Sequence, residues 1–249
     1  MPLPHLDDAD LLQVGRLRLV ETVAPSVPPH HQQARDAVWN AALKANPIGL
    51  FDGPVVVCSG LRRDGDTVQL SWARATYRHF ALRRVEGAAV LPSIFVTVAV
   101  PTEQGGLLVG RMSRTTAAPG RLQLPGGSME PPAEAEQLDT EALARHAARE
   151  LVEETGVDIP VADLRLWTLS RGEHGNIGVY FRAPTQPEAR VRERFRATLD
   201  AEVSAGREPE LCDIVFPRTA ADLAVLDGPR VDYLAPILDL HERELLSAG

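Results

Sequence analysis

The stretch GRLQLPGGSMEPPAEAEQLDTEALARHAARELVEETGV, residues 120–157, joins a paired-glycine turn to a charged helix. Its second half repeats apolar residues at helical spacing and follows Asp139 and Thr140, both of which favour helix N-caps. Gly156 comes just after the last turn, as glycine commonly does at a helix C-terminus. We therefore predict a helix over residues 140–155. The two glycines of the PGG sequence allow a tight turn and a close backbone approach to a ligand.

Three glutamates of the predicted helix lie on one side of it. At the helical period, Glu150, Glu153 and Glu154 fall within an arc of about 100° beside the apolar stripe. Carboxylates held this close repel one another, and a hard divalent cation relieves the repulsion. Mg²⁺ usually completes its coordination with water and substrate phosphate, so the pattern favours phosphate chemistry. The alternative is a solvent-exposed ladder of ion pairs at four-residue spacing, made of Glu141, Arg145, Arg149 and Glu153.

The composition excludes several classes of protein. The 249 residues include 26 basic and 34 acidic ones, and the net charge of −8 is unsuited to nucleic-acid binding, which depends on neutralising phosphates. The two cysteines, Cys58 and Cys212, cannot form a disulfide framework and suit a reducing cytoplasm. The N-terminus lacks a signal-peptide pattern, and the most apolar run, residues 88–101, is too short to span a membrane. We expect a cytoplasmic protein with no membrane or nucleic-acid partner.

Helical and strand patterns interleave along the chain, which predicts an α/β or α+β fold. The first ninety residues form a small α/β unit, with a helix ending before Pro47, a hairpin that turns at Asp64 and Gly65, and a short helix near residues 75–87. Beyond it we predict strands at 93–100, 106–112, 163–171, 176–183 and 211–217, and helices at 140–155, 188–205 and 233–249. Residues 115–127 are expected to form a loop. We place two domains at 1–90 and 91–249.

The predicted helix and its preceding turn resemble the Nudix box. In that box a glycine and a glutamate precede the pattern Arg-Glu-aliphatic-any-Glu-Glu-any-Gly-aliphatic at fixed spacing. The matching residues are Glu141, Arg149, Glu150, Leu151, Glu153, Glu154, Gly156 and Val157. Thirteen residues separate Gly127 from Glu141 where the box has five, so this loop carries an eight-residue insertion. The resemblance covers about residues 91–249 and implies a Nudix fold, with a mixed β-sheet sandwiched between helices.

The resemblance also implies roles for individual residues. Glu150 and Glu154 would be the principal ligands of Mg²⁺ or Mn²⁺, Glu153 a further ligand or a base acting through water, and the carbonyl of Gly126 an additional ligand. Arg149 would orient the glutamates and pair with Glu141. The family commonly takes a further acid from a later loop, for which Glu208 and Glu210 are candidates; both could instead be solvated carboxylates. The implied activity is metal-dependent hydrolysis of a nucleoside diphosphate joined to another group.

Segments outside the box bear on the substrate. The sequences NPIGLFDGPVV (46–56) and YRHF (77–80), with the enlarged box loop, resemble the Nudix hydrolases of UDP-glucose and UDP-galactose, which also carry an N-terminal domain. Residues 107–127 partly match the signature of coenzyme A pyrophosphatases. A UDP-sugar is therefore the first candidate substrate, and coenzyme A or ADP-ribose is the alternative. A Nudix fold that senses a nucleotide without hydrolysing it is a third interpretation.

Five residues are candidates for substrate binding. Tyr77 and Arg78 belong to the YRHF segment, Arg111 and Arg114 lie where a basic side chain could reach a phosphate, and Gly127 permits close approach of the backbone. Tyr77 could equally pack in a core, and the arginines could be solvated. The insertion is expected to reach over the leaving group, to tune substrate choice and to tolerate shortening. The expected partner is a small nucleoside diphosphate, and the chain could form a homodimer.

Overall fold

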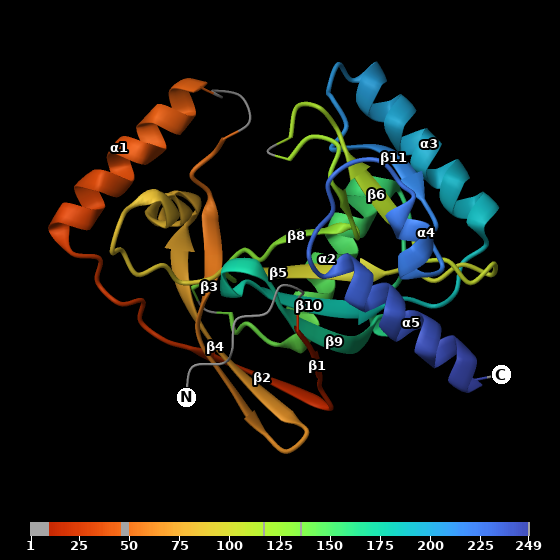
Figure 1. Cartoon of the computed structure of the whole chain (residues 1–249), viewed down its shortest axis with the longest axis horizontal. Helices are drawn as coiled ribbons and strands as arrows, with labels where there is room; N and C mark the ends of the chain where they lie inside the picture. The colour runs from red at the N-terminus through yellow and green to blue at the C-terminus, as the bar shows by residue number, and fades with distance from the viewer. Residues whose placement is uncertain (1–9, 46–49, 117, 135, 249) are drawn as a thin grey trace.

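The computed structural model describes residues 10–45, 50–116, 118–134 and 136–248 (Figure 1). The strands are β1 (Asp10–Gln13), β2 (Arg16–Glu21), β3 (Pro54–Asp64), β4 (Thr67–Thr76), β5 (Ile94–Ala99), β6 (Val109–Met112), β7 (Leu122–Gln123), β8 (Gly126–Ser128), β9 (Arg165–Arg171), β10 (Ile177–Arg182) and β11 (Leu211–Val215). The α-helices are α1 (Pro29–Ala45), α2 (Thr140–Thr155), α3 (Glu188–Ser204), α4 (Ala220–Ala224) and α5 (Leu234–Ala248). Short 3-10 helices are η1 (Tyr77–Arg84), η2 (Val161–Asp163) and η3 (Glu173–Gly175).

A mixed five-stranded sheet, in the order β1-β9-β10-β5-β8, forms the centre of the C-terminal part. Strands β10 and β5 are parallel, and the other pairs of this sheet are antiparallel. Strands β11, β6 and β7 form a second antiparallel sheet. The predicted mixed α/β class is confirmed.

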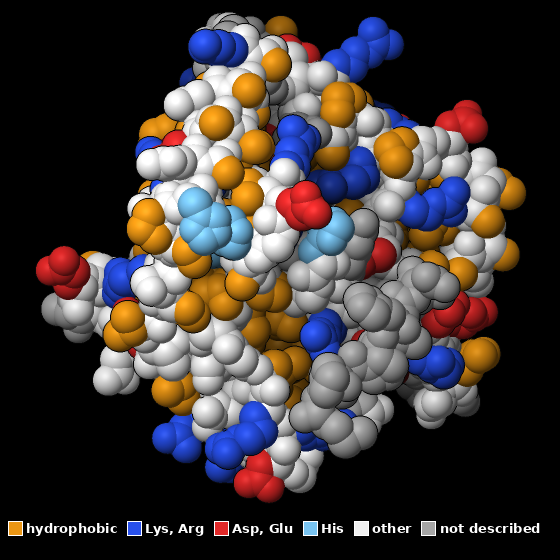
Figure 2. Space-filling view, turned by 60° about the vertical axis from the view of Figure 1, so that its left-hand side comes forward, with side chains coloured by type: hydrophobic (Ala, Val, Ile, Leu, Met, Phe, Trp, Pro, Cys, Tyr) orange, Lys and Arg blue, Asp and Glu red, His pale blue; other side chains and the backbone are white. Residues whose placement is uncertain are grey.

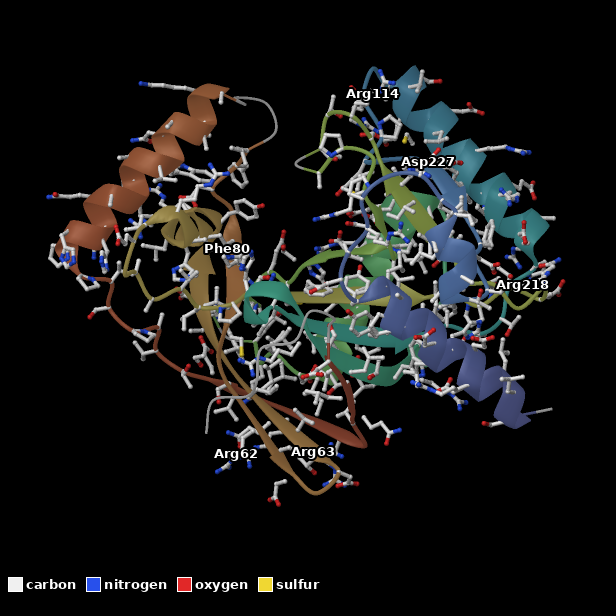
Figure 3. All side chains as sticks on the ribbon, viewed as in Figure 1. Arg62, Arg63, Phe80, Arg114, Arg218 and Asp227 are labelled. Atoms are coloured by element: carbon white, nitrogen blue, oxygen red, sulfur yellow. The ribbon has the colours of Figure 1, made fainter. Side chains whose placement is uncertain are left out.

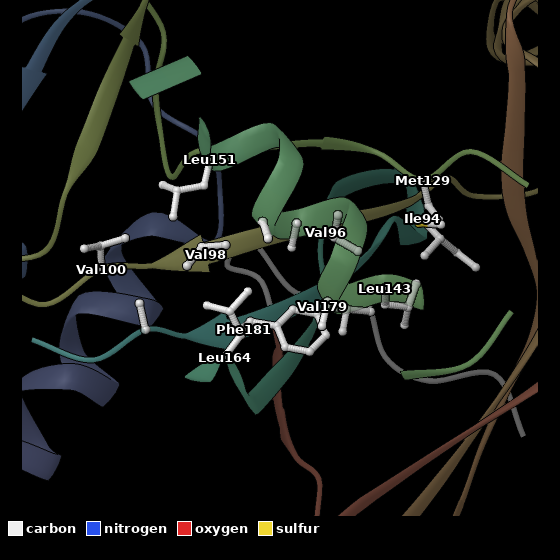
Figure 4. Packing of buried hydrophobic residues seen from close by; sticks show 14 of the residues in the cluster. Ile94, Val96, Val98, Val100, Met129, Leu143, Leu151, Leu164, Val179 and Phe181 are labelled. Carbon is white, nitrogen blue, oxygen red and sulfur yellow. The ribbon is translucent and has the colours of Figure 1, made fainter. Parts of the chain in front are cut away.

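The central sheet is covered by helices on both faces, as predicted. Side chains alternate along a strand, so neighbouring residues of β5 and β10 enter different cores. Val96, Val98, Val179 and Phe181 pack in one core with Leu143 and Leu151 of α2, as Figure 4 shows. Ala99 and Tyr180 pack in another core with Leu234, Ile237 and Leu238 of α5.

The N-terminal part contains the predicted hairpin and helix. Strand β4 lies between β3 and β2, antiparallel to the first and parallel to the second. Val68, Leu70 and Trp72 alternate with polar residues in β4 and are at most 2% exposed. Gly65 at the hairpin turn has φ of +59°, a conformation that favours glycine. The predicted helix near residues 75–87 is the 3-10 helix η1.

The two parts of the chain share one hydrophobic core. Val56 N–H donates to Met129 O at 2.8 Å and Cys58 N–H to Pro92 O at 2.7 Å, so β3 is joined to the start of β5 and the end of β8. Strand β1 pairs with β9 of the central sheet. Val56 and Leu70 lie in the same buried cluster as Val96 and Leu143. The core therefore runs across residue 90, and the domain boundary placed there stays a prediction.

The structure differs from the sequence-based expectations in its short strands. β1 and β2 were not predicted, and β7 and the first two residues of β8 lie in the segment 115–127 that was expected to be a loop. β7 and β8 have two and three residues, too few for a period-two pattern to be recognised.

Among the described residues, no helix is long and apolar enough to cross a membrane. On the face shown in Figure 2, arginine and lysine side chains are scattered among hydrophobic and uncharged ones.

Candidate active site

Helix α2 is held at both ends as the sequence predicts. The carboxylate of Asp139 caps the N-terminus by accepting from Ala142 N–H at 2.7 Å. Gly156 ends the helix with φ of +68°. A Cβ at Gly156 would lie 2.3 Å from Thr198 Oγ1 of α3, so the glycine also allows the two helices to approach closely. These contacts fix the rotation of α2 and with it the direction of its glutamates.

Glu154 is the buried member of the glutamate group. Its residue surface is 6% exposed, and its Oε2 accepts from Gly126 N–H of β8 at 2.8 Å. Its Oε1 is buried and has no hydrogen-bond partner among the described residues. Burial raises the pKa of Glu154 well above its ordinary value, and repulsion from Glu210 and then from Glu150 and Glu153 adds to this, against the opposing amide of Gly126.

Glu210 and Glu150 also have shifted pKa values. Burial and then repulsion from Glu150 and Glu153 raise the pKa of Glu210, although solvent still reaches its side chain. Burial alone would also raise the pKa of Glu150, but contacts with His146 and then with Arg149 outweigh it and hold this pKa below its ordinary value. His146 Nε2 lies 3.1 Å from Glu150 Oε1. Glu210 of the later loop is thus brought to the glutamates of α2, where the resemblance placed a further acid.

The paired glycines are required by close packing on both sides of the turn. A Cβ at Gly126, whose φ is +149°, would lie 2.1 Å from Val96 O of β5. A Cβ at Gly127 would lie 2.5 Å from Glu150 Oε2. Either distance is well inside van der Waals contact, so the turn meets the sheet and the carboxylate only because both side chains are absent.

Arg149 contacts several carboxylates of the site. Its guanidinium lies 3.6 Å from Glu150, 3.7 Å from Glu153 and 3.7 Å from Glu130 of the insertion. The expected pairing of Arg149 with Glu141 is not observed. Glu141 instead accepts from Arg145 at 2.7 Å, one turn closer, and its side chain is 72% exposed. The predicted orienting contacts of Arg149 are therefore made to Glu150 and Glu153, and Glu141 belongs to an exposed ion pair.

The donor set fits a hard divalent cation. After burial, repulsion from Glu210 and Glu150 raises the pKa of Glu154, and repulsion from Glu150 raises the pKa of Glu210. Glu154 Oε1 is a buried oxygen without a partner among the described residues. Oxygen ligands of this kind suit Mg²⁺ or Mn²⁺. Among the described residues, no group of three or more His, Cys, Asp or Glu side chains is already gathered at ligand spacing. The structure therefore shows the donors and their mutual repulsion, and a coordination sphere stays a prediction.

A cavity of about 770 Å³ opens beside these carboxylates, between the two parts of the chain. Gly126, Gly127 and Glu210 line it on the side of the glutamates, together with Glu208. Leu50, Phe51 and Tyr77 line it from the N-terminal part. Phe51 is 81% exposed, an unusual state for a large aromatic side chain. A volume of this size is typical of a site for a small organic ligand.

The predicted substrate-binding residues divide into two groups. Tyr77 and Gly127 line the cavity, and Tyr77 also packs edge-on against Trp39 and Phe80. The packing of Tyr77 is observed, and its role in substrate binding stays a prediction. The residues that do not line the cavity are Arg78, Arg111 and Arg114. Figure 3 shows Arg114 at the upper edge of the C-terminal part, whereas Phe80, which belongs to η1, lies in the N-terminal part.

Local acceptors explain two of the three arginines. Arg78 is paired with Asp52 through its backbone N–H and its guanidinium. Arg111 donates to the backbone oxygens of Gly120 at 3.3 Å and Asp227 at 2.6 Å, and so joins two loops. Sequence position alone does not reveal these partners, because they are distant in the chain.

Of the described residues of the insertion, Ser128 lines the cavity and those from Met129 onward do not. The rest of the loop packs against the N-terminal sheet. Arg74 of β4 donates to Pro132 O at 2.8 Å, and Met129 and Leu138 are at most 5% exposed in the core. The expectation that the insertion reaches over the leaving group and tunes substrate choice stays a prediction.

Several residues that line the cavity were not anticipated. They are Arg121, Gln123, Asn176, Arg230, Asp232 and Tyr233. Arg121 and Gln123 belong to the segment expected to be a loop, where the two-residue strand β7 is too short to give a recognisable alternation. The other four come from the β9–β10 turn and the segment before α5, which no motif marked.

The carboxylates of α2 lie next to a paired-glycine turn on a mixed sheet, and this turn lines the cavity. The comparisons with known proteins give the family. The NUDIX domain matches residues 92–235, and the chain belongs to this family and is a Nudix hydrolase. No curated protein matches the chain.

Several solved structures are similar to part of the chain. A MutT protein from Methanosarcina mazei Go1 is 19% identical over 62% of this chain and 96% of its own, with a TM-score of 0.39. The DR0079 protein from Deinococcus radiodurans is 16% identical over 74% of this chain and 98% of its own, with a TM-score of 0.40. A MutT/nudix family protein from Enterococcus faecalis is 17% identical over 50% of this chain and 43% of its own, with a TM-score of 0.31.

Proposed function

We propose that the chain hydrolyses the diphosphate of a nucleotide sugar, with a UDP-sugar as the first candidate. The observation that carries the proposal is the cavity shared by two sets of residues. Gly126, Gly127 and Glu210 line it beside the α2 carboxylates, and Phe51 and Tyr77 line it from the segments that resemble UDP-sugar hydrolases. Residues 46–49 of the first segment lie outside the described residues.

The proposed reaction consumes one water. Its oxygen forms a bond to one phosphorus, and the bond from that phosphorus to the bridging oxygen breaks. The products are a nucleoside monophosphate and a sugar phosphate, and the proton of the water passes to a carboxylate or to solvent. A divalent cation held by Glu150, Glu154 and the carbonyl of Gly126 would supply charge neutralisation and activation of the water. Glu153 or Glu210 would accept the proton, and Arg149 would hold Glu150 and Glu153 in place.

Coenzyme A and ADP-ribose are the alternative substrates, and nucleotide sensing without turnover is the alternative function. The intact set of glutamates favours turnover. The test is release of monophosphate from UDP-glucose, ADP-ribose and coenzyme A, each with Mg²⁺, with Mn²⁺ and with EDTA. We expect release that requires a cation, that is fastest with UDP-glucose, and that falls by orders of magnitude in Glu154→Gln. Binding of UDP-glucose without release from any of the three would favour the sensor.

A further inference from the structure

Arg121 has an unusual environment for a buried cation. The residue precedes β7, is half-buried, and lines the cavity. Its Nη2 donates to Gln123 Oε1 at 3.0 Å, whereas its Nε is buried and lacks a hydrogen-bond partner among the described residues. None of the ion pairs of the described residues includes it. Withdrawing a guanidinium from water costs free energy unless an anion or acceptor pairs with it, so Arg121 is suited to an anion from outside the chain.

The neighbouring arginines lack this combination. Arg230 also lines the cavity, but it is exposed and donates to Leu223 O at 3.1 Å. Arg111 does not line the cavity, and its guanidinium is used by two backbone carbonyls. Arg114 is exposed and lies away from the cavity wall. In the part of the wall that the structure describes, Arg121 is thus the basic residue that is both withdrawn from solvent and without an acidic partner.

Arg121 shares the cavity wall with the glutamate side of the site, since Gly126, Gly127 and Glu210 line the same cavity. Tyr233 lines the same cavity, and its hydroxyl interacts with the backbone of Leu124, with Arg121 and with Glu154. Burial raises the pKa of this hydroxyl, the Leu124 contact and Arg121 oppose the shift, and Glu154 adds to it. A ligand with two charged groups that occupies this cavity can therefore meet both Arg121 and the glutamate side of the site.

We propose that Arg121 binds a phosphate of the nucleotide ligand, as the second of two sites that divide the diphosphate between them. This inference rests on the proposed function and assigns its anion-binding residue. The glutamates repel a diphosphate unless a cation intervenes, so they cannot hold both phosphates by themselves. A guanidinium binds phosphate through forked N–H donors, and the contact is strongest where water is excluded.

The test measures binding without metal, so that the contribution of Arg121 is separated from that of the glutamates. UDP, ADP and inorganic pyrophosphate are titrated calorimetrically in EDTA into the wild type, Arg121→Gln, Arg121→Lys and the matched control Arg114→Gln. We expect Arg121→Gln to bind the preferred nucleotide about tenfold or more weakly, and Arg121→Lys to fall between it and the wild type because the fork is lost. Arg114→Gln should bind as the wild type does, and uridine and adenosine should not distinguish the variants.

Thermal unfolding provides a second readout. Since Arg121→Gln removes a half-buried charge without an acidic partner, the Tm of the variant without ligand should equal or exceed that of the wild type, while the rise in Tm caused by the nucleotide should be lost. Equal affinity of Arg121→Gln and wild type for all three ligands would overturn the proposal, as would a wild type that binds none of them. If Arg121→Gln does not fold, unchanged affinity of Arg121→Lys overturns it.

The outcomes separate this inference from the proposed hydrolysis. Binding that depends on Arg121, without monophosphate release from any diphosphate of the panel, would keep the anion site and reject the hydrolytic activity. Hydrolysis by Arg121→Gln with an unchanged KM would keep the hydrolytic activity and reject the anion site.

Discussion

Replacing Glu154 by glutamine should stabilise the metal-free protein. The substitution keeps the side-chain volume and an oxygen that can accept from Gly126 N–H. It removes an ionisable group whose pKa is raised by burial and by repulsion from Glu210, Glu150 and Glu153. The buried Oε1 has no hydrogen-bond partner among the described residues, and the amide nitrogen that replaces it would have none either. The free-energy cost of an unpaired buried polar atom is therefore present in both proteins and cancels.

The magnitude follows from proton linkage. A carboxyl whose pKa is raised in the folded state stabilises the protein fully below the pKa of the unfolded state, and this stability is lost as pH rises through the folded pKa. One pKa unit corresponds to about 1.4 kcal/mol, so over the roughly 2.5 pH units between the ordinary value of 4.5 and pH 7 the loss is at most about 3.4 kcal/mol. Glu154→Gln avoids this loss. Each kcal/mol changes the Tm of a chain of this size by about 2–4 °C.

The assay is denaturant unfolding in EDTA between pH 5 and pH 8, repeated with Mg²⁺. We expect the advantage of Glu154→Gln to grow with pH in EDTA and to shrink or reverse with Mg²⁺, because the cation stabilises only the wild type appreciably. Glu153→Gln is the matched control: this glutamate is on the same helix and 62% exposed, so its removal should change stability little. A pH-independent difference, or a Glu154→Gln protein that is less stable in EDTA at every pH, would refute the reasoning.

Three further predictions concern the turn, the N-terminal part and the insertion. Gly127→Ala should lower kcat by about 100-fold because its Cβ displaces the Glu150 carboxylate, whereas Gly60→Ala, with 3.6 Å of clearance, should leave kcat unchanged in the same assay. Asp52→Asn should lower the free energy of unfolding by about 1 kcal/mol at pH 7, screening included. Burial alone would raise the pKa of Asp52, but its contacts with Arg78 outweigh burial and lower this pKa. The stability difference between Asp52→Asn and the wild type should therefore vanish in unfolding curves as pH falls below 3.8. Shortening the insertion to five residues should cost about 2–5 kcal/mol in denaturant unfolding, because Met129 and Leu138 leave the core, whereas alanine at the exposed Glu134 and Glu136 should cost little.

The sequence predicted the parts of the site that depend on local spacing. The sequence predicted helix α2 with its Asp139 cap and its Gly156 end, because capping and helical periodicity act within a few residues. The position of Glu150, Glu153 and Glu154 on one side followed from the same period. The pairing of Arg149 with Glu141, which the resemblance implied, was wrong. Arg145 lies one turn nearer to Glu141 and takes the contact.

The cavity could not be predicted in the same way. Arg121, Tyr233 and Phe51 are up to 182 positions apart in the chain, and only the packing of two sheets and α5 brings them to one wall. The same holds for Arg78 and Arg111, whose partners Asp52 and Asp227 lie on other segments. Side chains with several donors take whichever acceptors the fold presents, and sequence spacing does not encode them.

The sequence by itself determined the carboxylate helix, the glycine turn and the mixed α/β class, since each depends on backbone preferences and periodicity over short distances. Only the tertiary structure decided which carboxylate is buried. Gly126 of β8 meets Glu154 because β8 pairs with β5, and the desolvation that raises the pKa of Glu154 comes from this contact between distant segments. The tertiary structure also decided that the insertion packs on the N-terminal sheet, where Met129 and Leu138 join the buried cluster that includes Val56 and Leu70.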